Sequence, residues 1–233
     1  MVWSKSRFQH SFEIFPRVLR EVFPLLLPLS ALLWGLEIFV SQLNKDRFAN
    51  PYDSSTLLLI LAGLGAVVLE SLITVVWILY VSRSTQRQMK NGVGEKSLSF
   101  LKRNFHQNLI EYVRAMISVG IYTLFLIIPG LIRWVKLTFT CFVAAFDPEY
   151  QEGKKDALET SSQIVKGSFL PLLFLLLFQM SFPFILEEIA KSLSMGLVAK
   201  VLLYGAAWMI SLYFAIYLAL TYFALASYKL RNS

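Results

Sequence analysis

The segment IIPGLIRWVKLTFTCFVAAFDPEYQEGKKDALETSSQIVKGSF, residues 127–169, carries the plan of the whole chain. In order, it holds an apolar span, a Pro-Gly turn, a second apolar span, a charged loop and an amphipathic helix. Apolar spans joined by short polar segments are typical of a chain that crosses a membrane several times. The rest of the sequence repeats or supports this arrangement.

Composition agrees with a membrane protein. The chain has 233 residues, of which 56% are hydrophobic and 19 are Phe, and its mean hydropathy is +0.59. This is more apolar surface than a soluble domain of this size buries, so a bilayer is the expected solvent. The N-terminal residues are charged and aromatic throughout. We therefore expect no cleavable signal peptide, and a first span that stays in the membrane as an anchor.

The apolar segments predict an all-α, polytopic helical bundle of about six spans. A helix needs about 20 mostly apolar residues to cross a hydrocarbon core of about 30 Å. The predicted spans are residues 25–40, 57–81, 109–128, 131–146, 169–186 and 195–228. We expect residues 1–233 to form a single integral membrane domain.

The distribution of Lys and Arg predicts the orientation. Fifteen of these residues fall on one side of the predicted topology and six on the other, while Arg114 lies inside a span. The positive-inside rule makes the richer side cytoplasmic, with both termini on it. The net charge of +7 therefore flanks apolar spans, which favours anionic phospholipid headgroups as partners and argues against nucleic acid.

A weak internal repeat lies on the cytoplasmic side. A basic residue precedes Phe by three positions at three span entrances, and these pairs are Arg20 with Phe23, Lys102 with Phe105, and Lys166 with Phe169. The pattern predicts three units, residues 1–82, 97–146 and 156–228, each with a cytoplasmic amphipathic elbow helix before a two-span hairpin. Arg20, Lys102, Arg103 and Lys166 are then candidate ligands of lipid headgroups. The alternative is that basic and aromatic residues commonly flank any helix that enters a membrane.

Charged residues inside or beside the spans form a second group of candidates. They are Glu37, Glu70, Glu111, Arg114, Arg133 and Lys136. An ionised side chain at the bilayer centre costs about 2.5–3.5 kcal/mol on insertion scales, so such residues usually have partners inside a helix bundle. The functional interpretation is a proton or ion relay through Glu70, or a polar site for a substrate headgroup between Glu37 and Arg133. The structural interpretation is ion pairing between helices, or a protonated, hydrogen-bonded Glu that fixes helix register.

The chain resembles a known family in residues 97–180. The resemblance rests on Pro129, Gly130, Ala157, Leu158, Ser161, Lys166, Gly167 and Phe169. This pattern resembles the membrane domain found ahead of bacterial glycerophosphoryl diester phosphodiesterases, and related standalone membrane proteins of uncharacterised function. Relatives often have Trp after the Ser, where this chain has Ser162. The resemblance implies a multi-pass protein of the bacterial inner membrane that has the membrane module without the enzyme, and it carries over no catalytic residue.

Residues with catalytic or metal-binding chemistry are sparse. His10 and His106 lie in basic surroundings and Cys141 lies in an apolar run, which favours ordinary solvated or packed roles and predicts no metal site. Nucleotide, zinc-protease and serine-hydrolase motifs do not occur. We therefore expect no cofactor and no enzymatic activity.

The sequence leaves several functions open. We expect a non-enzymatic, lipid-interacting membrane protein in envelope or lipid homeostasis or in membrane scaffolding. The alternative is a small transporter or channel that uses the intramembrane charges. A lipid enzyme would need a general base beside the hydroxyls of residues 160–162, and a homo-oligomer remains compatible with the sequence.

Overall fold

The computed structural model describes the backbone of residues 5–49, 55–90, 93–192 and 197–232. Side chains are described for residues 9–32, 63–90, 93–182, 185, 186, 188, 189, 203 and 205–227. All regular elements in this part of the chain are helical: α1 (Lys5–Ala49), α2 (Ser55–Met89), α3 (Ser97–Phe125), α4 (Ile127–Leu137), α5 (Thr140–Phe146), α6 (Pro148–Gln151), α7 (Ala157–Val165), a 3₁₀ turn (Lys166–Ser168), α8 (Phe169–Ser192) and α9 (Leu197–Asn232).

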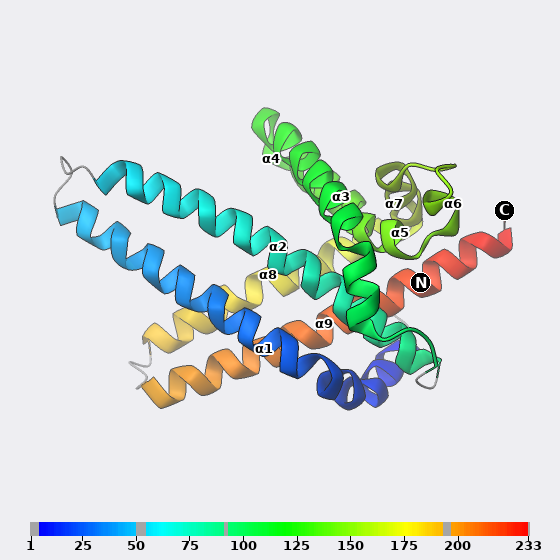
Figure 1. The fold of residues 1–233 in the computed structure, drawn as a ribbon, viewed down its shortest axis with the longest axis horizontal. Coiled ribbons are helices and arrows are strands. Elements are labelled where there is room, and N and C mark those ends of the chain that lie inside the picture. Colours follow the sequence, from blue (N-terminus) through cyan, green and yellow to red (C-terminus); the bar gives the residue numbers. More distant parts are fainter. Residues whose placement is uncertain (1–4, 50–54, 91–92, 193–196, 233) are drawn as a thin grey trace.

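The long helices pair into three hairpins, which are α1–α2, α3–α4 and α8–α9. Helices α1 and α2 lie side by side, as do α8 and α9, and α9 also packs against α1 and α2. Both of these long hairpins extend to the same side, whereas the α3–α4 hairpin points in another direction (Figure 1). Helices α5, α6 and α7 gather beside the first half of α3, at the end where both chain termini lie (Figure 1).

Four segments of the described residues are long and apolar enough to cross a membrane. They are Gly63–Met89, Ile127–Phe146, Ala157–Phe182 and Gly205–Ser227. These overlap the second, fourth, fifth and sixth predicted spans. The third predicted span is the second half of α3, whose hydropathy is lowered by Glu111 and Arg114, and half of the first, residues 33–40, lies outside the described side chains. The structure thus confirms an all-α chain with helices of membrane-spanning length, and the count of six stays a prediction.

The three predicted elbows differ in structure. Helix α1 runs without interruption for 45 residues and contains Pro16, Pro24 and Pro28. At 1.5 Å per residue it is about 68 Å long, far more than a hydrocarbon core of about 30 Å, so one end extends well outside the bilayer. Helix α3 is also continuous through the second predicted elbow. Only in the third unit do a separate helix, α7, and a 3₁₀ turn precede the long helix α8.

Helix α7 uses its apolar face within the protein. Leu158 packs with Ala115 of α3 and Leu137 of α4, and Val165 belongs to the large cluster around Phe139. Asp156 caps its N-terminus by accepting hydrogen bonds from the backbone N–H groups of Leu158 and Glu159. The sequence placed this amphipathic face in the membrane interface, but it covers α4 and α5 instead. An amphipathic pattern alone does not distinguish lipid from another helix as the apolar neighbour.

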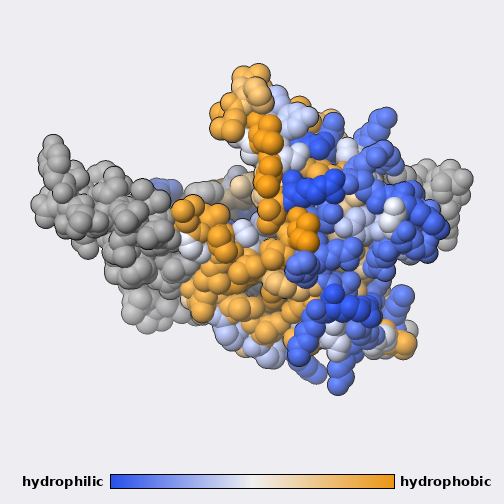
Figure 2. Space-filling model, turned by 45° about the horizontal axis from the view of Figure 1, so that its top comes forward, coloured by the Kyte–Doolittle hydropathy of each residue, from blue (hydrophilic) through white to orange (hydrophobic). Residues whose placement is uncertain are grey.

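The main hydrophobic cluster joins the central elements. Phe139, Phe142 and Tyr222 pack in edge-on and tilted pairs at centroid distances of 5.2–5.7 Å, and α4, α5, α7, α8 and α9 all contribute to this cluster. Aromatic pairs of this kind add about 0.5–1.5 kcal/mol beyond the burial of their area. The outside of the molecule is divided between a hydrophobic region and a hydrophilic end, which holds the α5–α7 region (Figure 2).

Candidate functional site: the basic end and its polar clusters

The hydrophilic end presents basic side chains to solvent, and it is called the basic end from here on. Arg20, Lys102 and Lys166 are all exposed, and the structure shows no ion pair for them among the described residues. Arg103 differs, because its Nη2 lies 2.9 Å from Glu95 Oε2 and its guanidinium lies 5.8 Å from the centre of the Phe100 ring. Three of the four predicted headgroup ligands are therefore available to an anion, and Arg103 has an internal partner.

A carboxylate beneath this surface ties three helices together. Oε1 of Glu21 accepts hydrogen bonds from Arg87 Nη1 at 2.7 Å and from Ser97 Oγ at 2.5 Å. Its Oε2 accepts from Ser84 Oγ at 2.8 Å. Because these groups come from α1, α2 and α3, this Glu21 cluster fixes the three helices relative to one another. No sequence pattern singles out Glu21, although it lies next to Arg20 at a predicted span entrance.

The environment of Glu21 favours its ionised form. Burial raises the pKa of the carboxyl group, but hydrogen bonds from Ser97 and Ser84 and the positive charge of Arg87 outweigh it, so the net pKa lies below the ordinary value of 4.5. A group with a lowered pKa in the folded state stabilises the protein above its unfolded pKa. That contribution is lost as the pH falls through the folded value.

Replacing Glu21 by Gln should destabilise the protein at neutral pH by about 1–2 kcal/mol. The substitution leaves Arg87 without its carboxylate, and the cost is smaller than for a fully buried pair because each side chain is about one-fifth exposed, 19% and 22%. Thermal unfolding in mild detergent measures the difference. Because the pKa of Glu21 is lowered, the gap between wild type and variant should shrink as the pH falls below about 4.5.

Glu13→Gln provides the matched control on the same helix. Glu13 is 74% exposed and lies 3.6 Å from His10, which is also exposed, so this variant should stay within about 0.5 kcal/mol of wild type. Equal losses in the two variants, or a gap that does not change with pH, would contradict the role assigned to the Glu21 cluster.

A second cluster accounts for two of the predicted intramembrane charges. Glu111 is buried at 6% exposure and accepts a hydrogen bond from Tyr150 Oη at 3.0 Å. Arg114 donates to both oxygens of Glu111 at 3.2 Å and to Asp156 Oδ2 at 2.5 Å. The sequence predicted the pairing of Glu111 with Arg114, and the structure extends it to Tyr150 and to the residue that caps α7.

The other predicted charges have varied positions. Arg133 donates from Nε to Ser118 Oγ at 2.9 Å and lies 5.5 Å from the centre of the Tyr122 ring, so its charge is held within the α3–α4 hairpin. Lys136 is half-buried. Glu70 is exposed on α2, and the side chain of Glu37 lies outside the described residues. Nothing in the described part of the chain joins these residues in one site.

The α3–α4 hairpin is short when measured from the Arg114–Asp156 pair. Eleven residues separate Arg114 from the end of α3 at Phe125, which is about 17 Å at 1.5 Å per residue. Its tip is strongly apolar, with Leu124, Phe125 and Ile127 exposed by 78–88%. The apolar tip of the hairpin therefore lies at a distance from this ion pair that equals about half the thickness of a hydrocarbon core.

Two residues of the family-like pattern form the joints of this region. Gly130 packs against Thr123 where α3 and α4 cross. Ser161 of α7 donates to the backbone carbonyl of Lys136 at 2.8 Å and accepts from the backbone N–H of Phe139 at 3.1 Å, where the chain breaks between α4 and α5. These contacts are structural, and they explain a glycine and a serine at these positions without a ligand.

Comparison with known proteins gives no relative. No family model, curated protein or solved structure matches this chain. The geometry of the site is therefore the basis for any statement about function. Within the described residues, no group of three or more His, Cys, Asp or Glu side chains is placed to hold a metal ion.

Proposed function

We propose that this chain is a non-enzymatic integral membrane protein that binds anionic phospholipid headgroups at its basic end. The observation that carries the proposal is the exposure of Arg20, Lys102 and Lys166, whereas Arg87, Arg103 and Arg114 are paired with carboxylates of the protein. The hydrophilic end adjoins the hydrophobic region of the surface (Figure 2). Basic groups at such a boundary meet the headgroup layer, where each is worth about 1 kcal/mol against anionic lipid.

The proposal includes the finer expectations from the sequence. The basic end faces the cytoplasm of a bacterial inner membrane, and six spans anchor it there. A role in envelope or lipid homeostasis or in scaffolding follows from lipid binding combined with the expected lack of catalytic chemistry. The sequence resemblance of residues 97–180 to phosphodiesterase membrane domains implies the membrane module without its enzyme. Transport through Glu70 has no supporting observation, since this side chain lies outside the cavity described below.

Reversing three charges tests the proposal. Replacing Arg20, Lys102 and Lys166 together by Glu should lower the retention of anionic phospholipid at least ten-fold, because about 3 kcal/mol of attraction is removed. Retention is measured by native mass spectrometry of protein released from its membrane in mild detergent. Zwitterionic lipid in the same spectra serves as the internal reference.

The control changes the same net charge at other positions. Lys90, Lys96 and Lys154 are also exposed, the last of them paired with Glu152, and can be replaced together by Glu. This variant should keep most of the anionic lipid. If both triple variants lose it equally, the three assigned residues are not a specific site, and if neither does, the proposed function is overturned.

A further inference from the structure

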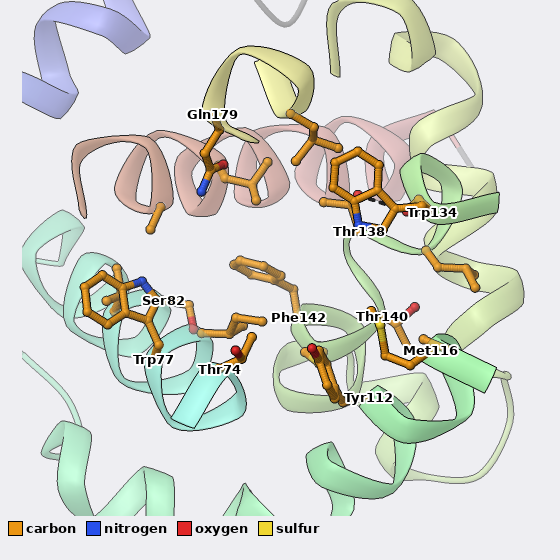
Figure 3. Close-up of a pocket in the computed structure, with 18 of the residues that line it drawn as sticks. Thr74, Trp77, Ser82, Tyr112, Met116, Trp134, Thr138, Thr140, Phe142 and Gln179 are labelled. Atoms are coloured by element: carbon orange, nitrogen blue, oxygen red, sulfur yellow. Dashed lines mark hydrogen bonds between the residues drawn. The ribbon is translucent and has the colours of Figure 1, made fainter. Parts of the chain in front are cut away.

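A cavity of about 420 Å³ lies between the three hairpins. Residues from α2, α3, α4, α5, α8 and α9 line it, among them Trp77, Met116, Phe142 and Gln179 (Figure 3). Its volume lies within the range of about 300–1,000 Å³ that is usual for ligand pockets. One water molecule occupies about 30 Å³ of liquid, so the cavity has room for about a dozen groups of that size. A single hydrocarbon chain occupies a similar volume.

The lining suits an uncharged, apolar occupant. No Asp, Glu, Lys, Arg or His is among the described residues that line the cavity. The hydroxyl groups of Ser82 and Thr138 donate to backbone carbonyls of their own helices, so they present little polarity to the interior. A phosphate or other charged headgroup would be left without a counter-charge, which excludes it as the occupant.

One buried hydroxyl group without a partner favours a ligand that contains a carbonyl group. Thr140 lines the cavity and is 1% exposed, and its Oγ1 has no hydrogen-bond partner among the described residues. A buried hydroxyl without a partner costs about 1–3 kcal/mol. An ester carbonyl at the head of a hydrocarbon chain would accept this hydrogen bond.

Two methionines that line the cavity are also exposed on the outside of the molecule. They are Met116 of α3 and Met180 of α8, which are 40% and 54% exposed. These two helices belong to hairpins that point in different directions (Figure 1). Methionine is flexible and adapts to apolar groups of varied shape. A chain from the surrounding bilayer thus has a lateral entrance between α3 and α8.

We propose that this cavity binds one acyl chain of a membrane phospholipid. The inference rests on the proposed function and deepens it, because it assigns the acyl chain of the phospholipid to the cavity and the headgroup to the basic end. The cavity itself does not select the headgroup. Acyl-chain binding should therefore occur with zwitterionic lipid and should survive loss of the basic residues.

Photolabelling in a bilayer tests the inference. The full chain is reconstituted in nanodiscs of phosphatidylcholine, a fraction of which carries a diazirine in the middle of one acyl chain, and labelled residues are mapped by mass spectrometry. Lipid around the outside reaches exposed residues such as Ile121, which is 50% exposed. Only a chain inside the cavity reaches Cys141 and Phe142, each 4% exposed, so we expect label on this pair as well as on Ile121.

Neighbouring residues on α3 supply matched variants. Met116→Trp should narrow the entrance and reduce the label on residues 141 and 142 at least five-fold relative to Ile121. Ile117→Trp should leave that ratio unchanged, since Ile117 is 59% exposed and does not line the cavity. Label on Ile121 with none on residues 141 and 142 would overturn the inference, as would labelling of this pair that Met116→Trp does not reduce.

The same assay separates this inference from the proposed function. In the variant with Glu at positions 20, 102 and 166, the label on residues 141 and 142 should be unchanged in phosphatidylcholine. A variant that loses anionic headgroups and keeps this label supports the cavity. Loss of the label from residues 141 and 142 in this variant, with Ile121 still labelled, would show that the acyl chain does not bind independently of the basic end. That result would overturn the inference.

Discussion

Gly130→Ala should destabilise the protein by about 3 kcal/mol and lower its thermal midpoint in mild detergent by about 6–12 °C. A Cβ atom on residue 130 would lie 2.8 Å from Cα of Thr123 and would also clash with its Oγ1. The closest backbone atom belongs to α3, so the two helices must move apart. Small residues permit this close approach, and any larger residue prevents it.

The same hairpin contains the control. A Cβ on Gly120 of α3 would meet no atom within 4 Å, so Gly120→Ala should be neutral or slightly stabilising through better helix propensity. Adding Thr123→Ala to Gly130→Ala should restore only part of the loss, because the clash with the backbone at residue 123 remains. Full recovery in the double variant would show that the side chain of Thr123, and not the backbone, sets the spacing.

Ser161→Ala should cost about 2–4 kcal/mol. Ser161 is fully buried, and its hydroxyl satisfies the carbonyl of Lys136 and the N–H of Phe139. Removing it leaves two backbone groups at the α4–α5 break without this partner, each at a cost of about 1–3 kcal/mol. The measurement is again thermal unfolding in detergent, together with faster hydrogen exchange at the amide of Phe139.

Ser162 is the adjacent control. It is only half-buried, and Ser162→Ala should change stability by less than about 0.5 kcal/mol. If Ser161→Ala is equally mild, the break between α4 and α5 does not depend on this hydroxyl. An unchanged exchange rate at Phe139 would contradict the assigned hydrogen bond directly.

These two predictions give physical reasons for part of the family-like pattern. Gly130 sets the crossing of α3 and α4, and Ser161 closes the joint between α4 and α5. Ala157 and Leu158 of the same pattern are buried where α7 packs on its neighbours. The pattern thus describes how the α3–α7 region is built, and a resemblance based on it concerns architecture more than binding.

The candidate site was partly accessible from sequence. Arg20, Lys102 and Lys166 were chosen because a basic residue precedes Phe at three span entrances. All three are exposed in the structure, and their binding of headgroups stays a prediction. The spacing of Glu111 and Arg114 predicted their pairing, since residues three apart share a helix face. Asp156 and Tyr150 could not be assigned to the same cluster, because they lie 39–45 residues from Glu111 in the chain.

The sequence by itself determined that this is an all-α protein with helices of membrane-spanning length, because hydropathy and apolar run length are properties of single segments. Only the tertiary structure decided that Glu21 joins three helices, that the apolar face of α7 covers α4 and α5, and that residues of six helices line one cavity. Those features depend on which surfaces meet. An amphipathic face or an isolated charge has the same sequence pattern whether its neighbour is lipid, water or another helix.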